Sequence, residues 1–324
     1  MAVVATILQR VLWAALLLLA VLVLNFSMMH LAPGDVADTI AQSMGGADAE
    51  VLEKIRSDYG LDQSFLSQLS NYIGKVFHFD LGYSYFYNQP VTRLIFEKLP
   101  ATLLLVITAQ LLALIVGVLL GVYSARNRDG WVSHFVTLFA LFGYSAPVFW
   151  TGILLLIAFS LKIPLFPVAG MVDVTVEGGF LAKFWDLLRH MVLPVTTLAS
   201  IFIALYSRLC RASMMEVLET DYIRTARSKG LSNNSIVYKH ALKNSLSPVI
   251  TLAGLQFSAV VSGAVLVETV FSWPGLGTLA LQSIIARDTP TILGILFFSA
   301  LVVIVGNLLT DLALKFIDPR VRGH

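Results

Sequence analysis

Six stretches of the chain contain no Asp, Glu, Lys or Arg, and they constrain the fold more than any other feature. They cover residues 11–34, 99–125, 130–161, 190–207, 244–267 and 289–310. A helix needs about 20 apolar residues to cross the roughly 30 Å hydrocarbon core of a bilayer, and each stretch is close to that length or longer. Only 13% of the 324 residues are charged, against about 25% in soluble domains. The sequence therefore predicts an all-α polytopic membrane protein with six transmembrane helices.

A seventh uncharged stretch, 269–286, contains the run Ser272-Trp273-Pro274-Gly275-Leu276-Gly277. Proline and two glycines interrupt a helix near its start. We therefore interpret this stretch as an extramembrane or re-entrant segment, which keeps the number of predicted spans at six.

Basic residues in the short connections predict the orientation, because Lys and Arg concentrate on the cytoplasmic side. The loop 208–247 carries seven bases and three acids, whereas 35–98 carries nine acids and five bases, and 162–189 carries three of each. The other bases near the spans are Arg10, Arg126, Arg128, Lys315, Arg320 and Arg322. Six spans with both termini cytoplasmic fit all of them.

Three regions follow from this topology. Residues 1–34 form the N-terminal tail and first transmembrane helix, 35–98 form a small external domain, and 99–324 form a five-helix core that contains the cytoplasmic loop 208–247. Within the external domain, 47–60 has helical spacing, and 81–90 has the aromatics of a short strand and turn. Its tyrosines are read either as packing or interfacial residues or as a surface for an external partner: Tyr83, Tyr85 and Tyr87.

The cytoplasmic loop predicts two helices joined by a glycine turn. Apolar and charged residues alternate at helical spacing over 214–229, and Gly230 stands where a helix C-terminus favours glycine. Ser232 offers an N-cap for a second short helix beginning near Ser235. Two interpretations stay open, namely an amphipathic pair on the anionic inner leaflet or a docking element for a soluble partner.

Several kinds of chemistry lack their motifs in this sequence. No Gly-x-x-x-x-Gly-Lys-Ser/Thr loop is present to hold ATP phosphates, and no His-Glu-x-x-His is present for zinc. The net charge of +2 gives no basic patch for nucleic acid. We expect His134 and His190 to be satisfied interfacial histidines rather than proton relays. Transport through this chain would therefore need a partner that supplies the energy.

Small residues indicate close helix packing at several places. Gly117 and Gly121 form a Gly-x-x-x-Gly pair, and Gly143-Tyr144-Ser145 reads better as a crossing than as a serine nucleophile. Gly254, Ser258 and Ser262 recur every four residues, which permits either close packing or a pore lining.

The cytoplasmic loop also resembles a known family. Residues 221–231 read Asp-Tyr-Ile-Arg-Thr-Ala-Arg-Ser-Lys-Gly-Leu, and they are similar to the Glu-Ala-Ala loop of permease subunits of bacterial ABC importers in the dipeptide, oligopeptide and nickel branch. Arg224 replaces the acid of the general motif, and Leu242-Lys243 stands where Leu-Pro is expected. Both departures from the general motif resemble the sequences typical of that branch.

The resemblance extends along almost the whole chain, in the order of the first permease subunit of that branch. The matching segments are Leu31-Ala32-Pro33-Gly34-Asp35, Leu61-Asp62-Gln63, Asp80-Leu81-Gly82-Tyr83-Ser84, Leu99-Pro100-Ala101-Thr102, Pro147-Val148-Phe149-Trp150, Phe271-Ser272-Trp273-Pro274-Gly275-Leu276-Gly277 and Asp318-Pro319-Arg320. It implies half of a translocation pore in the bacterial inner membrane, with no enzyme activity of its own. The implied partners are a second permease, two ATPase subunits that bind ATP and magnesium, and an external solute-binding protein.

The resemblance also implies roles for particular residues. The ATPase-coupling loop would comprise Asp221, Tyr222, Arg224, Thr225, Ala226, Arg227, Lys229, Gly230 and His240. An outer gate would comprise Phe271, Trp273, Pro274, Gly275 and Gly277, although Trp273 is equally typical of an interface anchor. No metal site is expected in the chain.

Short peptides are the first expectation for the cargo, because a pore walled by Ser, Thr, Gly and apolar residues offers a metal ion no cluster of ligands. Nickel or a metal chelate is the alternative, followed by other small solutes such as opines or glycosides. A membrane scaffold without transport is a more distant alternative, and an intramembrane hydrolase a remote one.

Overall fold

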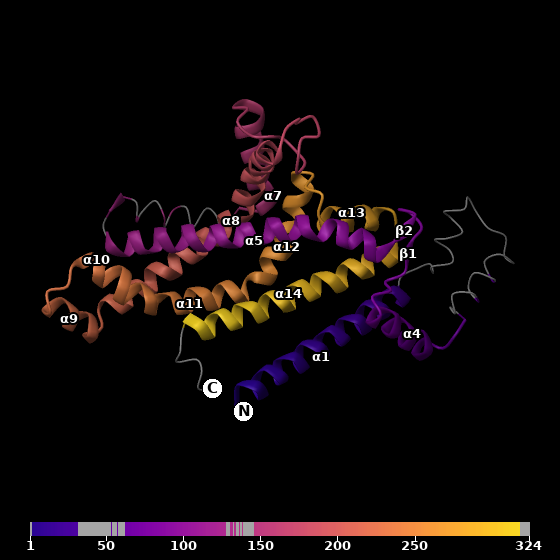
Figure 1. Cartoon of the computed structure of the whole chain (residues 1–324), viewed down its shortest axis with the longest axis horizontal. Coiled ribbons are helices and arrows are strands. Elements are labelled where there is room, and N and C mark those ends of the chain that lie inside the picture. Colours follow the sequence, from indigo (N-terminus) through magenta and orange to yellow (C-terminus); the bar gives the residue numbers. More distant parts are fainter. Residues whose placement is uncertain are drawn as a thin grey trace. The chain divides into compact units, whose positions relative to one another are not determined.

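A computed structural model describes residues 2–31, 53, 57, 62–127, 130, 131, 133, 136, 138 and 146–317, and the fold of this part is almost entirely helical (Figure 1). Its helices are α1 (Ala2–Leu31), α4 (Phe65–Phe77), α5 (Val91–Arg126), α7 (Val148–Leu156), α8 (Phe180–Leu218), α9 (Asp221–Ser228), α10 (Asn233–Ser235), α11 (Leu242–Leu255), α12 (Phe257–Val270), α13 (Leu276–Ile285) and α14 (Thr289–Ile317). Two π-helical turns, η1 (Ile157–Lys162) and η2 (Ile236–Ala241), extend α7 and join α10 to α11. The chain divides into two compact units, 1–100 with 278–304 and 101–277 with 305–324.

In the first unit, a two-stranded hairpin precedes α5. Strands β1 (Tyr83–Ser84) and β2 (Gln89–Pro90) pair antiparallel, which confirms the strand and turn predicted over 81–90. The tyrosines of the hairpin contact their neighbours: the Tyr83 hydroxyl donates to Asn88 over 2.7 Å, and the Tyr87 hydroxyl donates to Gln282 over 3.2 Å. Part of the aromatic surface predicted here is therefore used for packing within the chain.

A buried carboxylate fixes this hairpin to the start of α14. Asp288 is 3% exposed, and its Oδ2 accepts hydrogen bonds from Ser84 Oγ at 2.5 Å and from Thr291 Oγ1 at 2.6 Å. Because Thr291 lies in the first turn of α14, Asp288 links the hairpin to the start of that helix. The sequence pattern gave no sign of this contact.

In the second unit, the close crossing predicted at the Gly-x-x-x-Gly pair is confirmed. A Cβ on Gly117 would lie 2.9 Å from Cβ of Tyr206, and a Cβ on Gly121 would lie 2.6 Å from Cβ of Cys210. Only glycine allows α5 and α8 to approach so closely. Tyr206 and Cys210 are both fully buried at this crossing.

Within the described part of the chain, three helices are long and apolar enough to cross a membrane: α5, α8 and the 289–310 part of α14. A fourth candidate is the pair formed by 233–255 and α12, which bends by 52° at Gln256. The described apolar parts of α1 and of α7 with η1 are shorter than 18 residues. The seventh stretch contains the last two residues of α12, a turn and then α13, whose 10 residues are too few to span a bilayer, in agreement with its exclusion from the predicted spans.

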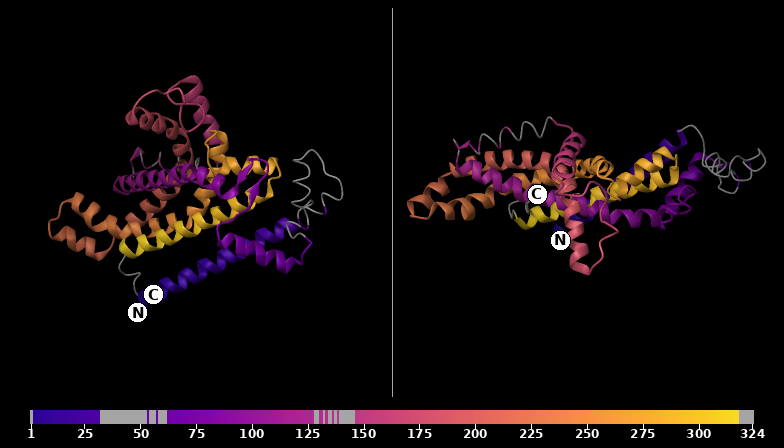
Figure 2. Two further views of the ribbon diagram at one scale, coloured as in Figure 1. Left: turned by 45° about the vertical axis from the view of Figure 1, so that its right-hand side comes forward. Right: turned by 90° about the horizontal axis from the view of Figure 1, so that it is seen from above.

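The cytoplasmic loop differs in two respects from the prediction. The helix predicted over 214–229 is two helices, because α8 continues to Leu218 and the chain then adopts an extended conformation at Thr220 before α9 begins. The following helix begins at Asn233, two residues earlier than expected, since the Ser232 hydroxyl accepts the backbone N–H of Ser235. Helices α8 and α11 lie side by side, and α9 and α10 connect them at one end (Figures 1 and 2).

Some predictions concern residues outside the described part of the chain. They are most of the helix at 47–60, His134, the segment 143–145 and the final motif 318–320. The boundaries of α5 and α8 lie outside the uncharged stretches that predicted them, since α5 begins at Val91 and α8 covers 39 residues. At 1.5 Å per residue, α8 is about 58 Å long and exceeds the roughly 30 Å hydrocarbon core.

Candidate functional site

We call residues 221–244 the coupling segment. Its first element, α9, packs against the rest of the protein through two apolar side chains, since Ile223 is 0% and Ala226 is 7% exposed. The remaining predicted coupling residues of α9 are exposed: Asp221, Tyr222, Arg224, Thr225 and Arg227. The period of three between the buried positions fits one helical face. Of the predicted set, Ala226 therefore supports the helix, while the polar residues remain available to a partner.

The ends of α9 are set by local backbone chemistry. Thr220 adopts an extended conformation as the N-cap residue, and Lys229 follows the last helical residue as the C-cap. Gly230 has φ +75°, a left-handed conformation that glycine adopts without a steric penalty. The helix end predicted from Gly230 is confirmed, and a Cβ there would meet nothing within 4 Å.

Few polar contacts hold the exposed face of the coupling segment. Asn244 Nδ2 donates to the Tyr222 hydroxyl over 2.7 Å, which connects α9 to α11. Arg224 and Asp221 form an ion pair of 3.2 Å on the surface, which contributes little to stability. His240 lies half-buried in η2, which contacts α9. All nine predicted coupling residues thus lie in the coupling segment, in which α9 contacts η2.

We call residues 268–277 the Glu268 turn. It contains the five residues predicted to shape an outer gate, of which Phe271, Trp273, Gly275 and Gly277 are buried and Pro274 is half-buried. The Trp273 indole N–H donates to the backbone oxygen of Ala101 over 2.9 Å. This bond ties the turn to α5.

Glu268, at the last part of α12, is the residue that sequence reasoning missed. It is 0% exposed, its Oε1 accepts the Thr102 hydroxyl at 2.6 Å, and its Oε2 accepts the backbone N–H of Gly277 at 2.6 Å. Thr102 Oγ1 in turn accepts the backbone N–H of Leu276 at 2.7 Å. Glu268 directly follows the uncharged stretch 244–267, so the pattern of uncharged stretches assigns it no role. An acid at the end of an apolar stretch, followed by a proline and glycine turn, was the available signal.

Gly254, Ser258 and Ser262 do not share one environment, because the break at Gln256 separates the glycine from the serines. A Cβ on Gly254 would lie 2.3 Å from Cγ2 of Thr310, so Gly254 packs closely against α14. Ser258 and Ser262 are exposed on α12. The packing alternative therefore applies to Gly254, and the pore-lining alternative stays open for the two serines.

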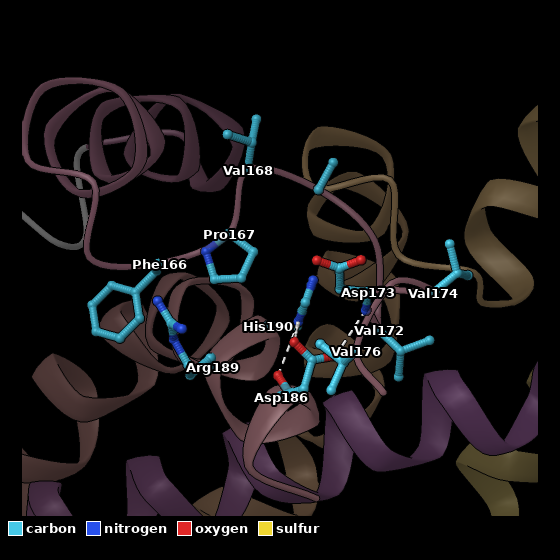
Figure 3. A pocket seen from close by; sticks show the side chains of 11 residues that line it. Phe166, Pro167, Val168, Val172, Asp173, Val174, Val176, Asp186, Arg189 and His190 are labelled. Carbon is cyan, nitrogen blue, oxygen red and sulfur yellow. Dashed lines mark hydrogen bonds and ion pairs between the residues drawn. The ribbon is translucent and has the colours of Figure 1, made fainter. Parts of the chain in front are cut away.

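A cavity of about 650 Å³ lies between the 166–176 loop and the first turns of α8 (Figure 3). His190 Nδ1 lies 2.9 Å from the backbone oxygen of Asp186 and 3.3 Å from its Oδ1, so this histidine has partners, as predicted. Asp186 Oδ2 also accepts the backbone N–H of Asp173 at 2.7 Å. Hydrogen bonds from the hydroxyl and backbone N–H of Thr175 hold the pKa of Asp173 below its usual value. These contacts order the loop around the cavity.

Among the described residues, no group of three or more histidine, cysteine, aspartate or glutamate side chains is placed to hold a metal ion.

Apolar helices of spanning length define a multi-pass membrane protein. The chain belongs to the family of binding-protein-dependent transport system inner membrane components, whose model matches residues 117–323. A second model, for the N-terminal part of such membrane components, matches residues 3–106. The chain is therefore a permease subunit of an ABC importer and not its ATP-hydrolysing subunit.

Relatives cover the chain from end to end. A Brucella abortus (strain 2308) protein named for a peptide transport system permease is 42% identical over 318 residues, which are 98% of this chain and 99% of the relative. The dipeptide transport system permease protein DppB of Haemophilus influenzae is 37% identical over 97% of this chain and 98% of its own. The oligopeptide transport system permease protein AppB of Bacillus subtilis is 36% identical over 98% and 99%.

A solved structure shares the fold. A chain of the MetNI methionine ABC transporter matches with a TM-score of 0.54 and 16% identity, over 69% of this chain and 96% of that one. At this level of identity the match shows the architecture alone, so the cargo has to be argued from other observations.

Proposed function

We propose that the chain forms half of the translocation pathway of a bacterial inner-membrane importer for short peptides. The proposed cargo is supported by the names of relatives that are 36–42% identical over nearly their full length, which refer to peptide, dipeptide and oligopeptide transport. The proposed partners are a second permease, two ATPase subunits that bind ATP and magnesium, and an external solute-binding protein. In this proposal the chain itself binds no cofactor.

The coupling segment supports the contact with the ATPase. Arg224 and Arg227 of α9 and Lys229 at its C-cap are basic and exposed, and α9 rests on only two buried side chains. Such a helix presents charge to a partner while a small apolar base fixes its position. We propose that α9 docks on an acidic ATPase surface and that the movement of the ATPase pair enters the permease there.

The cargo is tested by reconstituting the assembled complex with its own binding protein in vesicles and comparing labelled di- to pentapeptides with chelated nickel. Peptide entry that depends on ATP and on the binding protein supports the proposal. Nickel entry without peptide entry would favour the nickel alternative and leave the permease assignment unchanged. An assembled complex that imports neither solute would count against both cargoes.

The proposed topology has six spans, both termini in the cytoplasm, an external domain at 35–98 and residues 271–277 shaping an outer gate. Cysteine labelling tests it, because Cys210, the one native cysteine, is fully buried. Val174 is 94% exposed in the 166–176 loop, and Leu231 is 40% exposed beside α9. Val174→Cys should react with an impermeant thiol reagent from outside, and Leu231→Cys only from the cytoplasm. The reverse pattern would invalidate the topology.

A further inference from the structure

The Glu268 turn joins three separate pieces of the second unit through one buried carboxylate. Both oxygens of Glu268 accept hydrogen bonds, one from the Thr102 hydroxyl in α5 and one from the backbone N–H of Gly277. The backbone oxygen of Glu268 accepts the backbone N–H of Trp273 over 2.8 Å. The end of α12, the turn and the α5 residue Thr102 are therefore linked at a single residue.

The direction of these hydrogen bonds specifies a carboxylate. Thr102 Oγ1 accepts the backbone N–H of Leu276, so its own hydrogen is free to point to Glu268. Donors thus approach both carboxylate oxygens, and an amide in this place could keep both contacts only if the Thr102 hydroxyl turned its hydrogen away and accepted from the amide N–H₂. Gly275 leaves the room needed, since a Cβ on it would lie only 2.3 Å from Oε1 of Glu268.

Packing alone does not explain a carboxylate at this place. Burying a charge away from water is unfavourable, and apolar residues of similar size often stabilise a fold at least as well as a buried ionic group. The carboxylate instead fixes the orientation of α12 relative to α5, through hydrogen bonds that an apolar side chain cannot form. Hydrogen bonds of this kind keep two helices aligned when one of them moves.

The elements between the coupling segment and Glu268 are continuous. Helix α9 contacts η2, and η2 continues without interruption into α11. After the bend at Gln256, α11 continues as α12, which ends at the Glu268 turn. A displacement of α9 can therefore reach Glu268 through helices that follow one another directly in the chain, with one 52° bend at Gln256, and can pass from Glu268 through Thr102 to α5.

We propose that Glu268 is a positioning residue for transport, which locks the end of α12 to α5 so that movement entering at the coupling segment reaches both helices together. This inference rests on the proposed function of the coupling segment. Loss of the lock leaves ATP hydrolysis by the partner subunits intact and separates it from solute movement.

The test compares variants of the complete importer in vesicles. Glu268→Gln keeps the size of the side chain and replaces one acceptor by a donor, and Thr102→Val removes the hydroxyl. Thr102→Ser keeps the hydroxyl. Thr269→Val is the matched control, because Thr269 is exposed beside Glu268 and its hydroxyl donates only within its own helix, to Val265. The measured quantity is the number of peptides imported per ATP hydrolysed.

We expect Glu268→Gln and Thr102→Val to lower this ratio about tenfold or more, with ATP hydrolysis within about twofold of the unaltered complex. Thr102→Ser and Thr269→Val should keep the ratio within about twofold. A purely structural role would lower the amount of assembled complex and leave the ratio unchanged. An unchanged ratio in assembled Thr102→Val or Glu268→Gln complexes would overturn the inference. Failure of both to assemble, while Thr102→Ser assembles, would do so as well.

The two proposals fail in different ways. If the unaltered complex imports no peptide, the proposed cargo is wrong, and the stimulation of ATP hydrolysis by the binding protein replaces uptake as the readout. Under the inference, Glu268→Gln and Thr102→Val weaken that stimulation and Thr269→Val does not. Stimulation equal to that of the unaltered complex in both variants would again overturn it.

Discussion

The coupling segment and the Glu268 turn use polar residues in opposite ways. In the coupling segment, Tyr222 is 43% exposed, and the charged side chains of α9 point away from its apolar base. In the Glu268 turn, Trp273 and Glu268 are 0% exposed, and both donate or accept hydrogen bonds within the chain. Exposed polar residues remain free for a partner, whereas buried ones determine the shape of the chain itself. Substitutions should therefore affect the contact with a partner in the first region and the alignment of helices within the chain in the second.

The largest effect is expected from Gly275→Ala. The added Cβ would overlap the Glu268 carboxylate at 2.3–2.5 Å in a site without free space. Overpacking of this kind destabilises by about 1–3 kcal/mol or more, so the apparent melting temperature of the complex in detergent should fall by several degrees. Gly74→Ala is the control, because a Cβ there meets nothing within 4 Å. Equal melting temperatures for both variants would show that the turn can rearrange.

The next effect is expected from Arg224→Ala in the coupling segment. Arg224 is exposed and pairs only with Asp221 on the surface, so the melting temperature should stay within about 2 °C. Peptide uptake should fall about tenfold, because truncating an arginine at an interface commonly costs more than 1 kcal/mol of binding. Lys183→Ala, a change of an exposed base in the first turn of α8, should alter neither quantity. Normal uptake with Arg224→Ala would remove Arg224 from the docking surface.

A smaller effect separates backbone strain from surface shape at Gly230. With φ +75°, a leucine would be disfavoured by about 1 kcal/mol or more, while asparagine tolerates this conformation. Gly230→Leu should reduce peptides imported per ATP several-fold, and Gly230→Asn should reduce it less. Because a Cβ at this position meets no atom of the chain, any loss common to both variants would come from contact with the partner.

The smallest effect is expected from Tyr222→Phe. This change removes the hydroxyl that accepts the 2.7 Å hydrogen bond from Asn244 and leaves the ring in place. A single exposed hydrogen bond contributes about 0.5 kcal/mol, so uptake should change by less than about threefold. Asn244→Ala should give the same change, and the double variant should be no worse than either single variant. A much larger loss would assign the Tyr222 hydroxyl to the partner contact.

Periodicity and local turn chemistry were sufficient for much of the fold. The glycine pair of α5, the hairpin at 81–90 and the helix end at Gly230 were each predicted from neighbouring residues, because each depends on a backbone conformation or a close approach that few residue types allow. The coupling residues were predicted from a family resemblance that the family assignment supports.

Contacts between distant residues could not be predicted in this way. Glu268 and Thr102 are separated by 166 positions, and Ser84 and Asp288 by 204. Nothing local to either residue indicates its partner. The helix break at Thr220 was missed as well, since the apolar spacing of 214–229 continues across it. A regular pattern predicts a helix but carries little information about where the chain turns.

The sequence by itself determined that this chain belongs in a membrane, that it is helical, and where a partner could act on it, because hydrophobic length and exposed motifs are properties of single segments. Only the tertiary structure decided which polar residues are buried and therefore cannot contact a partner protein. Trp273 belongs to the motif predicted to shape an outer gate, yet in the fold its indole N–H donates to α5, and Glu268 just before that motif accepts hydrogen bonds from α5 and the turn. The reason is physical: a buried polar group needs a hydrogen-bond partner, and the folded chain can supply that partner from a residue far away in the sequence.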